Sequence, residues 1–329
     1  MERINDIEKK YKLVSLFAGI GGIDLGFEFA GFDCIWANDF DKFACKTYRA
    51  NVGDQIVEGD IRLTKDNIPA HDILVGGFPC QPFSTLGKLQ GFEDDKNRGS
   101  LFFEIMDIIT RHDTKVAVLE NVKNLVNHDG GKTFTRIKKE LEDAGYDVNT
   151  QILNSQDYGI PQRRNRIFIV AFNRKYFKTS KFSFPKKEEL KLTTQDLLDD
   201  NVTEGYFLTK KIEKTILGIG TKGYIVKPSI DLPISKTLTA TMHKMHRASQ
   251  DNYVTDHKNF DRNVLDKEKR IAVRKLTPNE CRQLQGFPSE WTQVVSDSQA
   301  YKQFGNAVTV DVAYKVACQV IKYMEENER

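Results

Sequence analysis

The alternation of short apolar runs with amphipathic stretches constrains the fold of this 329-residue chain more than any other feature. The apolar runs, which we predict as β-strands, are residues 13–17, 34–37, 72–75, 116–119 and 167–172. Stretches with helical spacing lie between them, and a further one follows at 313–324. Strands that alternate with helices predict an α/β domain on a mostly parallel sheet, against which this last helix packs. Ligands bind at the carboxyl ends of the strands in such sheets.

The first run ends in the loop Phe17-Ala18-Gly19-Ile20-Gly21-Gly22. Its glycines let a ligand approach the backbone closely, although glycine turns after strands also serve purely structural purposes. Asp39 ends the second run, where its carboxylate is placed to accept hydrogen bonds from ribose hydroxyls, and Asp60 offers a similar contact. The loop lacks the lysine of a phosphate-binding P-loop. These features favour a cofactor that carries a nucleoside.

Cys80 is the candidate nucleophile among five scattered cysteines. None of the five forms the CxxC pair typical of zinc sites, so we predict free thiols and no metal. Pro79 and Pro82 flank Cys80 and hold its thiol on a rigid turn after the run 72–75. A thiol with a pKa of about 8.5 is only slightly ionised at neutral pH, so the site must supply positive charge or a proton acceptor. An inert core cysteine is the alternative interpretation.

Two further polar features lie at strand ends. Glu120 follows the run 116–119, where it is either a solvated strand terminus or a proton donor and acceptor in the same cleft as Cys80. The run Gln162-Arg163-Arg164-Asn165-Arg166 places three guanidinium groups beside the last predicted strand. Such a cluster can bind phosphate or steady a carboxylate and a thiolate.

Positive charge is concentrated in one segment. Residues 206–275 contain 15 Lys and Arg against 7 Asp and Glu, a local net charge of +8, whereas the whole chain carries +3. This segregation is typical of polyanion binding, with a solvated charged face as the alternative. A polar connecting segment around Pro185 precedes it and indicates a domain boundary. With no signal peptide and no apolar stretch of about 18 residues, we expect an intracellular protein.

Six motifs resemble, in order and spacing, the motif set of bacterial cytosine-C5 DNA methyltransferases of the restriction-modification type. They are Phe17 to Gly22, Gly77-Phe78-Pro79-Cys80-Gln81-Pro82-Phe83-Ser84, Glu120-Asn121-Val122, Gln162 to Arg166, Arg274 to Cys281 with Gln285-Gly286-Phe287-Pro288, and Gln303-Phe304-Gly305-Asn306-Ala307-Val308. The resemblance covers nearly the entire chain. It implies a Rossmann-like S-adenosylmethionine-dependent methyltransferase sheet with helices on both faces, formed by residues 1–184 and 278–329. It also implies a smaller, largely β or irregular target-recognition domain at residues 185–277.

For catalysis, the resemblance implies that Cys80 adds to C6 of a cytosine swung out of duplex DNA. This addition makes C5 nucleophilic toward the methyl group of S-adenosyl-L-methionine. Glu120 would contact N3 and the exocyclic amine, while Arg164 and Arg166 would orient the cysteine, the base and the nearby backbone. Loss of the C5 proton and elimination of Cys80 would then release 5-methylcytosine.

For the cofactor, the resemblance implies a set of contacts that runs from the adenine to the methionine end. The residues are Phe17, Ala18, Gly19, Gly21, Gly22, Asp39 for the ribose, Phe40 for stacking on adenine, Asp60 for the adenine amine, Phe78, Pro79, Leu101 for packing, Asn306 and Ala307. The family pattern often has Glu then Trp where this sequence has Asp39 then Phe40. Both changes are conservative, and they bear on affinity more than on function.

For double-stranded DNA, the resemblance implies a mobile loop at residues 84–98 that closes over the duplex. The expected DNA contacts are Ser84, Leu86 and Lys88 in this loop, Thr237 of the Thr237-Leu238 pair typical of target-recognition domains, and His243, Lys244, His246 and Arg247 in the basic segment. No membrane partner is expected.

The implied protein is a site-specific DNA (cytosine-5-)-methyltransferase that works as a monomer in the cytoplasm, bacterial or phage-encoded. A cognate restriction endonuclease, where one exists, would act separately. Two alternatives stay open: an RNA cytosine-C5 methyltransferase on the same scaffold, and a catalytically inactive relative that only binds DNA. The full-length variable segment favours DNA, and intact Cys80, Glu120 and Arg164 argue against inactivity. Only about a dozen residues precede the first strand, so we expect no N-terminal helix-turn-helix for autorepression.

Overall fold

The computed structural model describes residues 9–78, 101–178, 181–221, 224–225, 227–260 and 269–329. The chain divides into two compact units, each assembled from segments that are separate in sequence. The sheet unit consists of residues 2–153, 165–186 and 312–329. The second unit consists of residues 154–164 and 187–311.

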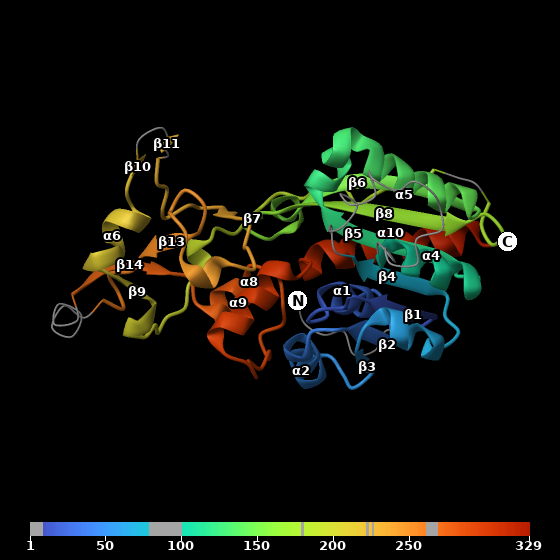
Figure 1. Ribbon diagram of the computed structural model, residues 1–329, viewed down its shortest axis with the longest axis horizontal. Helices are drawn as coiled ribbons and strands as arrows, with labels where there is room; N and C mark the ends of the chain where they lie inside the picture. Colours follow the sequence, from blue (N-terminus) through green and yellow to red (C-terminus); the bar gives the residue numbers. More distant parts are fainter. Residues whose placement is uncertain (1–8, 79–100, 179–180, 222–223, 226, 261–268) are drawn as a thin grey trace. The chain divides into compact units, whose positions relative to one another are not determined.

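A seven-stranded sheet in the order β3-β2-β1-β4-β5-β8-β6 organises the sheet unit (Figure 1). Its strands are β1 (Tyr11–Leu16), β2 (Phe32–Asp39), β3 (Ile56–Glu58), β4 (Ile73–Gly77), β5 (Val116–Val122), β6 (Tyr146–Asn154) and β8 (Asn165–Asn173). β1 pairs in parallel with β2 and β4, β2 with β3, and β4 with β5, whereas β8 runs antiparallel to β5. The predicted α/β fold with a mostly parallel sheet is confirmed.

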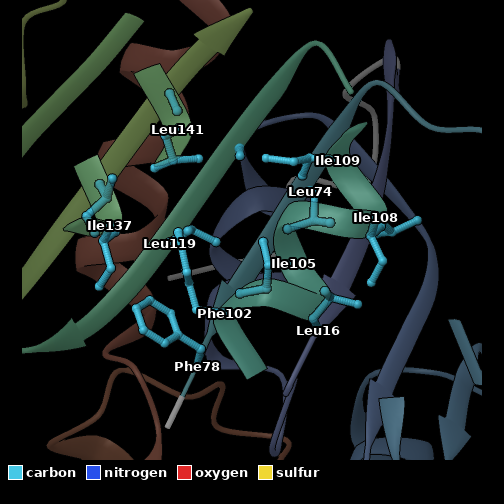
Figure 2. Packing of buried hydrophobic residues seen from close by; sticks show 14 of the residues in the cluster. Leu16, Leu74, Phe78, Phe102, Ile105, Ile108, Ile109, Leu119, Ile137 and Leu141 are labelled. Carbon is cyan, nitrogen blue, oxygen red and sulfur yellow. The ribbon is translucent and has the colours of Figure 1, made fainter. Parts of the chain in front are cut away.

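Helices cover both faces of this sheet. They are α1 (Gly22–Phe29), α2 (Lys42–Asn51), α3 (Ile61–Thr64), α4 (Leu101–Arg111), α5 (Lys132–Asp143) and α10 (Val310–Asn327). On one face, Ile105 of α4 and Ile137 of α5 pack in a fully buried apolar cluster with Leu119 of β5 (Figure 2). On the other face, the Tyr323 ring of α10 lies 4.1 Å from the Phe172 ring of β8, centroid to centroid. The helix expected at 313–324 therefore packs on the sheet as predicted.

Several strands differ from the sequence prediction, among them β5 and β6. β5 continues to Val122, so Glu120 and Asn121 belong to the strand rather than following it. Edge strand β6 was missed because Asp147, Asn149, Thr150 and Gln151 interrupt its apolar alternation. An edge strand is half solvated, so its side chains carry a weak periodic signal.

The second unit is built on a three-stranded sheet in the order β13-β14-β9, with the strands running antiparallel. Its elements are β7 (Gln162–Arg163), β9 (Phe207–Thr209), α6 (Lys210–Ile216), β10 (Gly220–Thr221), β11 (Tyr224–Ile225), β12 (Ser235–Lys236), β13 (Tyr253–Thr255), β14 (Arg270–Lys275), α8 (Pro278–Gln283) and α9 (Asp297–Asn306). Short β12 pairs in parallel with β7. Little of this unit showed a clear period in the sequence, and α8 and α9 were not predicted as helices.

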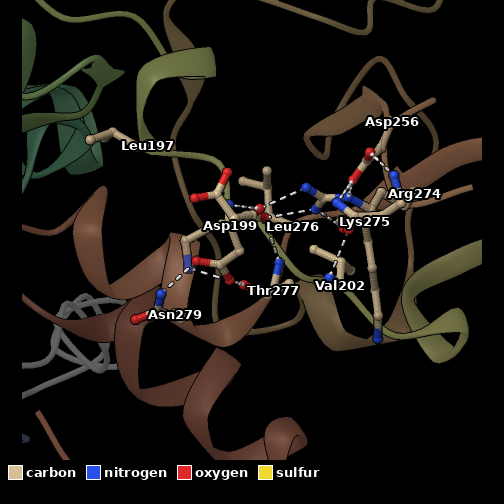
Figure 3. Close-up of polar contacts among 12 residues, drawn as sticks. Leu197, Asp199, Val202, Asp256, Arg274, Lys275, Leu276, Thr277 and Asn279 are labelled. Atoms are coloured by element: carbon tan, nitrogen blue, oxygen red, sulfur yellow. Dashed lines mark hydrogen bonds and ion pairs between the residues drawn. The ribbon is translucent and has the colours of Figure 1, made fainter.

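A buried ion network connects the small sheet to α8 (Figure 3). The Arg274 guanidinium is fully buried and donates to Asp256 at 2.6 Å and to both carboxylate oxygens of Glu280 at 2.7 and 2.9 Å. Glu280 also completes a capping box with Thr277, which starts α8. Through Glu280 this network holds α8 against the small sheet, and residues 278–311 pack in the second unit. The predicted boundary at residue 278 does not coincide with this packing, and the functional assignment of the domains stays a prediction.

Candidate active site at the carboxyl ends of the strands

Strand register brings several chain segments to one edge of the large sheet. Leu16 of β1 pairs with Asn38 of β2 and with Gly76 of β4, and the next residue, Gly77, pairs with Glu120 of β5. Because these strands are parallel, the segments that follow them all leave from this edge. The chain proceeds from β1 to β2 on one side, while β4 lies on the other side of β1. Such a topological switch point is where α/β sheets bind ligands.

The glycine loop after β1 has a backbone shape that few side chains tolerate. Phe17, Gly19 and Gly21 adopt positive φ angles of 55°, 59° and 85°. The loop is tied to β2 because the Ala18 amide donates to the Asn38 carbonyl at 2.9 Å. A Cβ atom added to Gly19 would meet no heavy atom within 4 Å, so the backbone here faces open space. A ligand can therefore approach the main chain directly.

Asp39 links this loop to the end of β2. Its carboxylate accepts hydrogen bonds from the backbone amides of Gly19 and Asp41, both at 2.8 Å. Burial raises the pKa of the Asp39 carboxyl, while the two amides oppose the shift. Each carboxylate oxygen keeps a further lone pair for a hydroxyl donor. The neighbouring Phe40 ring is 77% exposed, which leaves an aromatic face free to stack on a planar ligand.

Asp60 and Leu101 lie farther along the same unit. Asp60 caps α3 and its carboxylate is held by the Arg62 side chain, with Nε at 2.9 and 3.1 Å from the two oxygens. The Arg62 guanidinium lowers the pKa of Asp60. Leu101 begins α4 and packs partly buried against the apolar cluster. The contact of Asp60 with an adenine amine stays a prediction, and the structure adds Arg62 as a competing partner.

Glu120 and Arg166 form an ion pair at the end of β5. Arg166 Nε lies 2.9 Å from Glu120 Oε1, and the two side chains are only 15% and 10% exposed. Beside them, the Asn121 amide donates to the Phe78 carbonyl at 2.8 Å. A carboxylate that is buried, paired and held on a rigid strand can present one fixed oxygen to a ring nitrogen or amine.

The predicted nucleophile and several of its neighbours lie outside the described residues. They are Pro79, Cys80, Ser84, Leu86 and Lys88. Phe78, the last described residue before them, is buried and lies against α4, with its ring 5.9 Å from that of Phe102. The Pro79-Cys80 segment therefore follows the end of β4, and Glu120 lies on the neighbouring strand β5.

Arg164 occupies a different environment from Arg166. Its guanidinium is buried in the second unit and donates to the carbonyls of Leu238 at 2.9 Å, Gly305 at 2.9 Å and Ala307 at 2.6 Å. These contacts fix backbone segments that are far apart in sequence. The expected orientation of nearby backbone by Arg164 therefore has an identified target, whereas contact with the cysteine or the base stays a prediction.

The Thr237-Leu238 pair is held by the same part of the chain. Thr237 Oγ1 donates to the Arg163 carbonyl, and the Leu238 amide donates to the Gln162 side chain at 3.0 Å. Gln162 is fully buried and also donates to the Leu284 carbonyl at 2.6 Å. Gln162 and Arg163 of the arginine motif thus hold the predicted recognition pair, Thr237-Leu238, by hydrogen bonds within the second unit.

The remaining predicted contacts of the second unit lie on or near its surface. Asn306 is exposed at the end of α9, and Ala307 is half-buried directly after it. Lys244 is exposed, whereas His243, His246 and Arg247 are half-buried. The His246 amide donates to Asp251 at 2.8 Å, which fixes the backbone next to Arg247.

Three residues with clear structural roles, two in the sheet unit and one in the second unit, were given none by the sequence. Asn38 donates to the carbonyls of Val57 and Gly59 at 2.9 and 3.0 Å and so holds the end of β3. Asn121 holds the Phe78 carbonyl, and Gln162 holds the recognition pair. The available signal was an amide side chain at the end of an apolar strand, where a buried amide needs partners.

Among the residues that the structure describes, no group of three or more His, Cys, Asp or Glu side chains is arranged to hold a metal ion. Within the same residues, every helix is too short or too polar to span a bilayer.

Comparison with known proteins gives consistent matches. The profile described as C-5 cytosine-specific DNA methylase matches residues 11–322. Type II methyltransferase M1.ScrFI of Lactococcus lactis subsp. cremoris is 39% identical over 330 residues, covering 97% of this chain and 80% of the relative. Type II methyltransferase M.SsoII of Shigella sonnei is 38% identical over 331 residues, covering 98% and 83%. The crystal structure of S. pombe Dnmt2 methyltransferase superposes with a TM-score of 0.73 at 20% identity, covering 96% of this chain and 99% of that one, which shows a shared fold.

Proposed function

This chain belongs to the family of C-5 cytosine-specific DNA methylases, and we propose from that membership that it is a site-specific DNA (cytosine-5-)-methyltransferase. The observation that carries the proposal is the buried Glu120–Arg166 pair, which lies on the strand beside the one that leads to Cys80. The relatives are named type II methyltransferases, so we also propose the modification role of a restriction-modification system.

In this proposal Cys80 is the nucleophile. Its thiolate forms a bond to C6 of a flipped cytosine, the electron pair of the C5–C6 double bond shifts to form a C4–C5 double bond, and the pair of the C4–N3 double bond moves to N3, where Glu120 supplies a hydrogen bond or proton. When bound, S-adenosyl-L-methionine would supply the methyl group for C5 and leave as S-adenosylhomocysteine. Loss of the C5 proton to a base and departure of the Cys80 thiolate then restore the double bond.

Arg166 and Arg164 have separate tasks in this scheme. Arg166 holds the Glu120 carboxylate at 2.9 Å, which aims that carboxylate at the base. Arg164 acts through the backbone, because its guanidinium is bonded to three carbonyls of the second unit. We therefore propose that Arg164 is a positioning residue, while Glu120 and Arg166 act at the base.

The described residues of the sheet unit fit S-adenosyl-L-methionine. Open space at Gly19 admits a ligand beside the loop, the Asp39 carboxylate retains lone pairs for ribose hydroxyls, and the exposed Phe40 ring offers a stacking face for adenine. We propose the rest of the cofactor contacts at Phe17, Ala18, Gly21, Gly22, Asp60, Phe78, Pro79, Leu101, Asn306 and Ala307.

Duplex DNA is the proposed partner. We propose that residues 185–277 provide target recognition, with contacts from Thr237, His243, Lys244, His246 and Arg247. Ser84, Leu86 and Lys88 contact the duplex from the predicted loop at residues 84–98. Enzymes that methylate bacterial DNA meet it in the cytoplasm, so we propose cytoplasmic action as a monomer, with a cognate endonuclease acting separately.

Methyl transfer tests the proposal. Purified protein is incubated with labelled S-adenosyl-L-methionine and either unmethylated duplex DNA or tRNA. We expect label in DNA, and none with Cys80→Ser. Label in tRNA instead of DNA would make the chain an RNA methyltransferase, and background label with both substrates would make it a DNA-binding relative without activity. Bisulfite sequencing of host DNA after expression then reads the methylated sequence.

A mechanism-based trap tests Cys80 separately. Duplex DNA that carries 5-fluorocytosine cannot lose a proton from C5, so the Cys80 adduct should persist as a complex that survives denaturing gel electrophoresis. Glu120→Gln should form the complex slowly. A complex that forms equally well with Cys80→Ser would show that another residue attacks the base.

A further inference from the structure

A buried carboxylate lies directly behind the glycine loop. Asp24, in the first turn of α1, is completely buried. Its two oxygens accept hydrogen bonds from Ser15 Oγ of β1 at 2.6 Å and from Tyr48 Oη of α2 at 2.7 Å. The Cys34 thiol of β2 lies 3.9 Å from the second of these oxygens. One side chain thus connects the four elements nearest to the loop.

This arrangement is energetically expensive for the fold. Burial raises the pKa of Asp24 to about 6, although the hydrogen bonds from Ser15 and Tyr48 oppose the shift. An apolar side chain at this position would avoid the loss of hydration. Short hydrogen bonds to a carboxylate, in contrast, fix the positions of their donors within narrow limits. The contribution of Asp24 is therefore the fixed position of its two donors, Ser15 and Tyr48.

Both hydrogen-bond donors to Asp24, Ser15 and Tyr48, lie next to the glycine loop. Ser15 lies two residues before Phe17, where the backbone first turns to positive φ. The Tyr48 ring supports the other end of the loop, since a Cβ atom added to Gly21 would lie 3.1 Å from Tyr48 Cε2 and 2.9 Å from Val52 Cγ2. Gly21 is also the residue that caps α1. Asp24 therefore holds the entrance and the exit of the loop at a fixed separation.

We propose that Asp24 is a positioning residue for the cofactor: through Ser15 and Tyr48 it keeps residues 17–22 in the shape that accepts the adenosyl ligand. The proposal rests on the proposed function, which assigns this loop to S-adenosyl-L-methionine. Asp24 itself touches neither the cofactor nor the base. Its removal should consequently change cofactor affinity and leave the chemical step and the affinity for DNA intact.

Asp24→Asn is the central variant, because it conserves shape and removes the charge. The single carbonyl oxygen of asparagine can accept only one of the two hydroxyls in the same way, so one anchor of the loop is lost. We expect Kd for S-adenosyl-L-methionine and for S-adenosylhomocysteine to rise together by about tenfold, as loss of a hydrogen bond to a charged group implies. Tyr48→Phe, which retains the ring behind Gly21, should show a smaller rise. With saturating cofactor, kcat and KM for DNA should stay within about threefold of wild type.

Asp72→Asn is the matched control. Asp72 lies in the same unit but just before β4, at the amino ends of the parallel strands, where it accepts the Lys12 amide at 3.0 Å and pairs with Lys115 at 3.2 Å. We expect unchanged cofactor binding for this variant. Circular dichroism and thermal unfolding confirm that each variant is folded before calorimetric titration with either ligand.

The outcomes separate the two proposals. If the wild-type chain binds no S-adenosyl-L-methionine, the proposed function fails. If wild type binds and Asp24→Asn binds equally well, the positioning role of Asp24 is wrong. Weaker binding of S-adenosyl-L-methionine alone, with the Kd for S-adenosylhomocysteine unchanged, would also overturn the positioning role. A displaced loop must weaken the binding of both ligands. An effect on only the positively charged sulfonium ligand would instead indicate a direct effect of the Asp24 charge.

Discussion

Arg164 and Arg166 are separated by one residue, yet their surroundings give the two side chains different partners. Arg166 pairs with a buried carboxylate at the sheet edge, whereas Arg164 donates to three backbone carbonyls. A guanidinium is always charged and has five donors in a rigid fork, so either setting satisfies it. The same chemical group is thus held by a carboxylate in one case and by backbone carbonyls in the other.

Glu120→Gln should test the catalytic assignment at this scale. Glutamine keeps the shape but loses the negative charge that pairs with Arg166, and it cannot deliver a proton to the ring. We expect kcat to fall by about 100-fold or more, with KM for DNA changed little. Steady-state kinetics with duplex DNA measures both. Glu140→Gln on the exposed side of α5 serves as the control and should keep wild-type kcat; an equal loss there would point to a general folding defect.

Asp24 should also leave a signature in the dependence of stability on pH. Its pKa is raised from about 3.9 in the unfolded chain to about 6 in the fold, so the native state holds the proton more tightly. The stabilisation from this group is complete below about pH 4 and is lost as pH rises toward 6. Between pH 4.5 and 7.5, the free energy of unfolding of Asp24→Asn relative to wild type should rise by about 2 kcal/mol. Urea unfolding at both pH values measures it, and a difference independent of pH would contradict the buried, shifted carboxylate.

Among the elements, the short segment after β12 shows how an irregular stretch acquires a defined shape. β12 pairs with β7, the Leu238 carbonyl accepts from Arg164, and the backbone of Thr239 passes directly against Gly305 of α9. Long-range partners replace the internal hydrogen bonds that a longer strand or helix would have. The predicted recognition pair therefore depends on α9 for its position.

Gly305→Ala should disturb this dependence. A Cβ atom at residue 305 would lie 2.2 Å from the Thr239 carbonyl carbon and 2.3 Å from the Ala240 nitrogen, so backbone would have to move. We expect KM for DNA to rise about tenfold and discrimination between cognate and altered sequences to fall. Gly205→Ala in the same unit, where a Cβ atom meets nothing within 4 Å, is the control. Unchanged DNA kinetics for both variants would disconnect α9 from recognition.

Arg274→Met should show how much the buried ion network contributes to the second unit. The substitution leaves the Asp256 and Glu280 carboxylates, 7% and 1% exposed, without their shared cation. Breaking a buried pair in this way costs about 3–5 kcal/mol. Lys258→Met removes an exposed cation from its pair with Asp200 and should cost less than about 1 kcal/mol. Chemical denaturation compares the two, and similar small losses would mean that solvent reaches the network.

At the scale of the whole molecule, charge and chemistry are distributed over different parts of the chain. Residues 206–275 carry a net charge of +8 and lie in the second unit, whereas the glycine loop and the Glu120–Arg166 pair belong to the sheet unit. In the proposed function, DNA and the nucleoside cofactor are therefore bound by different physical forces. The first attraction is long-ranged and screened by salt; the second depends on short contacts.

Salt should therefore separate the two binding events. Between 50 and 200 mM salt, we expect the affinity for duplex DNA to fall by at least about tenfold through release of counterions from the phosphates. Affinity for S-adenosyl-L-methionine should change less than about twofold. Fluorescence anisotropy with labelled DNA and calorimetry with the cofactor give the two slopes. Equal slopes would argue against the basic segment as the DNA-binding surface.

Sequence pattern was sufficient for most of the sheet unit. Period and composition indicated β1, β2, β4, β5 and β8 within a few residues, and with them the strand ends where Asp39 and Glu120 lie. Such features are local, because the spacing of apolar residues along one element decides its type and its buried face. Motif order identified the family, which the comparisons confirm.

What tertiary structure alone decided was the partner of each polar group. No local pattern connects Arg164 to Gly305, which are 141 residues apart, or Asp24 to Tyr48, 24 residues away on another helix. Asp39 holds the amide of Gly19, whereas its contact with a ribose stays a prediction. Hydrogen bonds between distant segments form only once packing has brought those segments together. The sequence by itself therefore determined the family, most strands of the large sheet and the candidate residues, and packing determined which side chains hold the glycine loop, the Thr237-Leu238 pair and the Glu120 carboxylate in place.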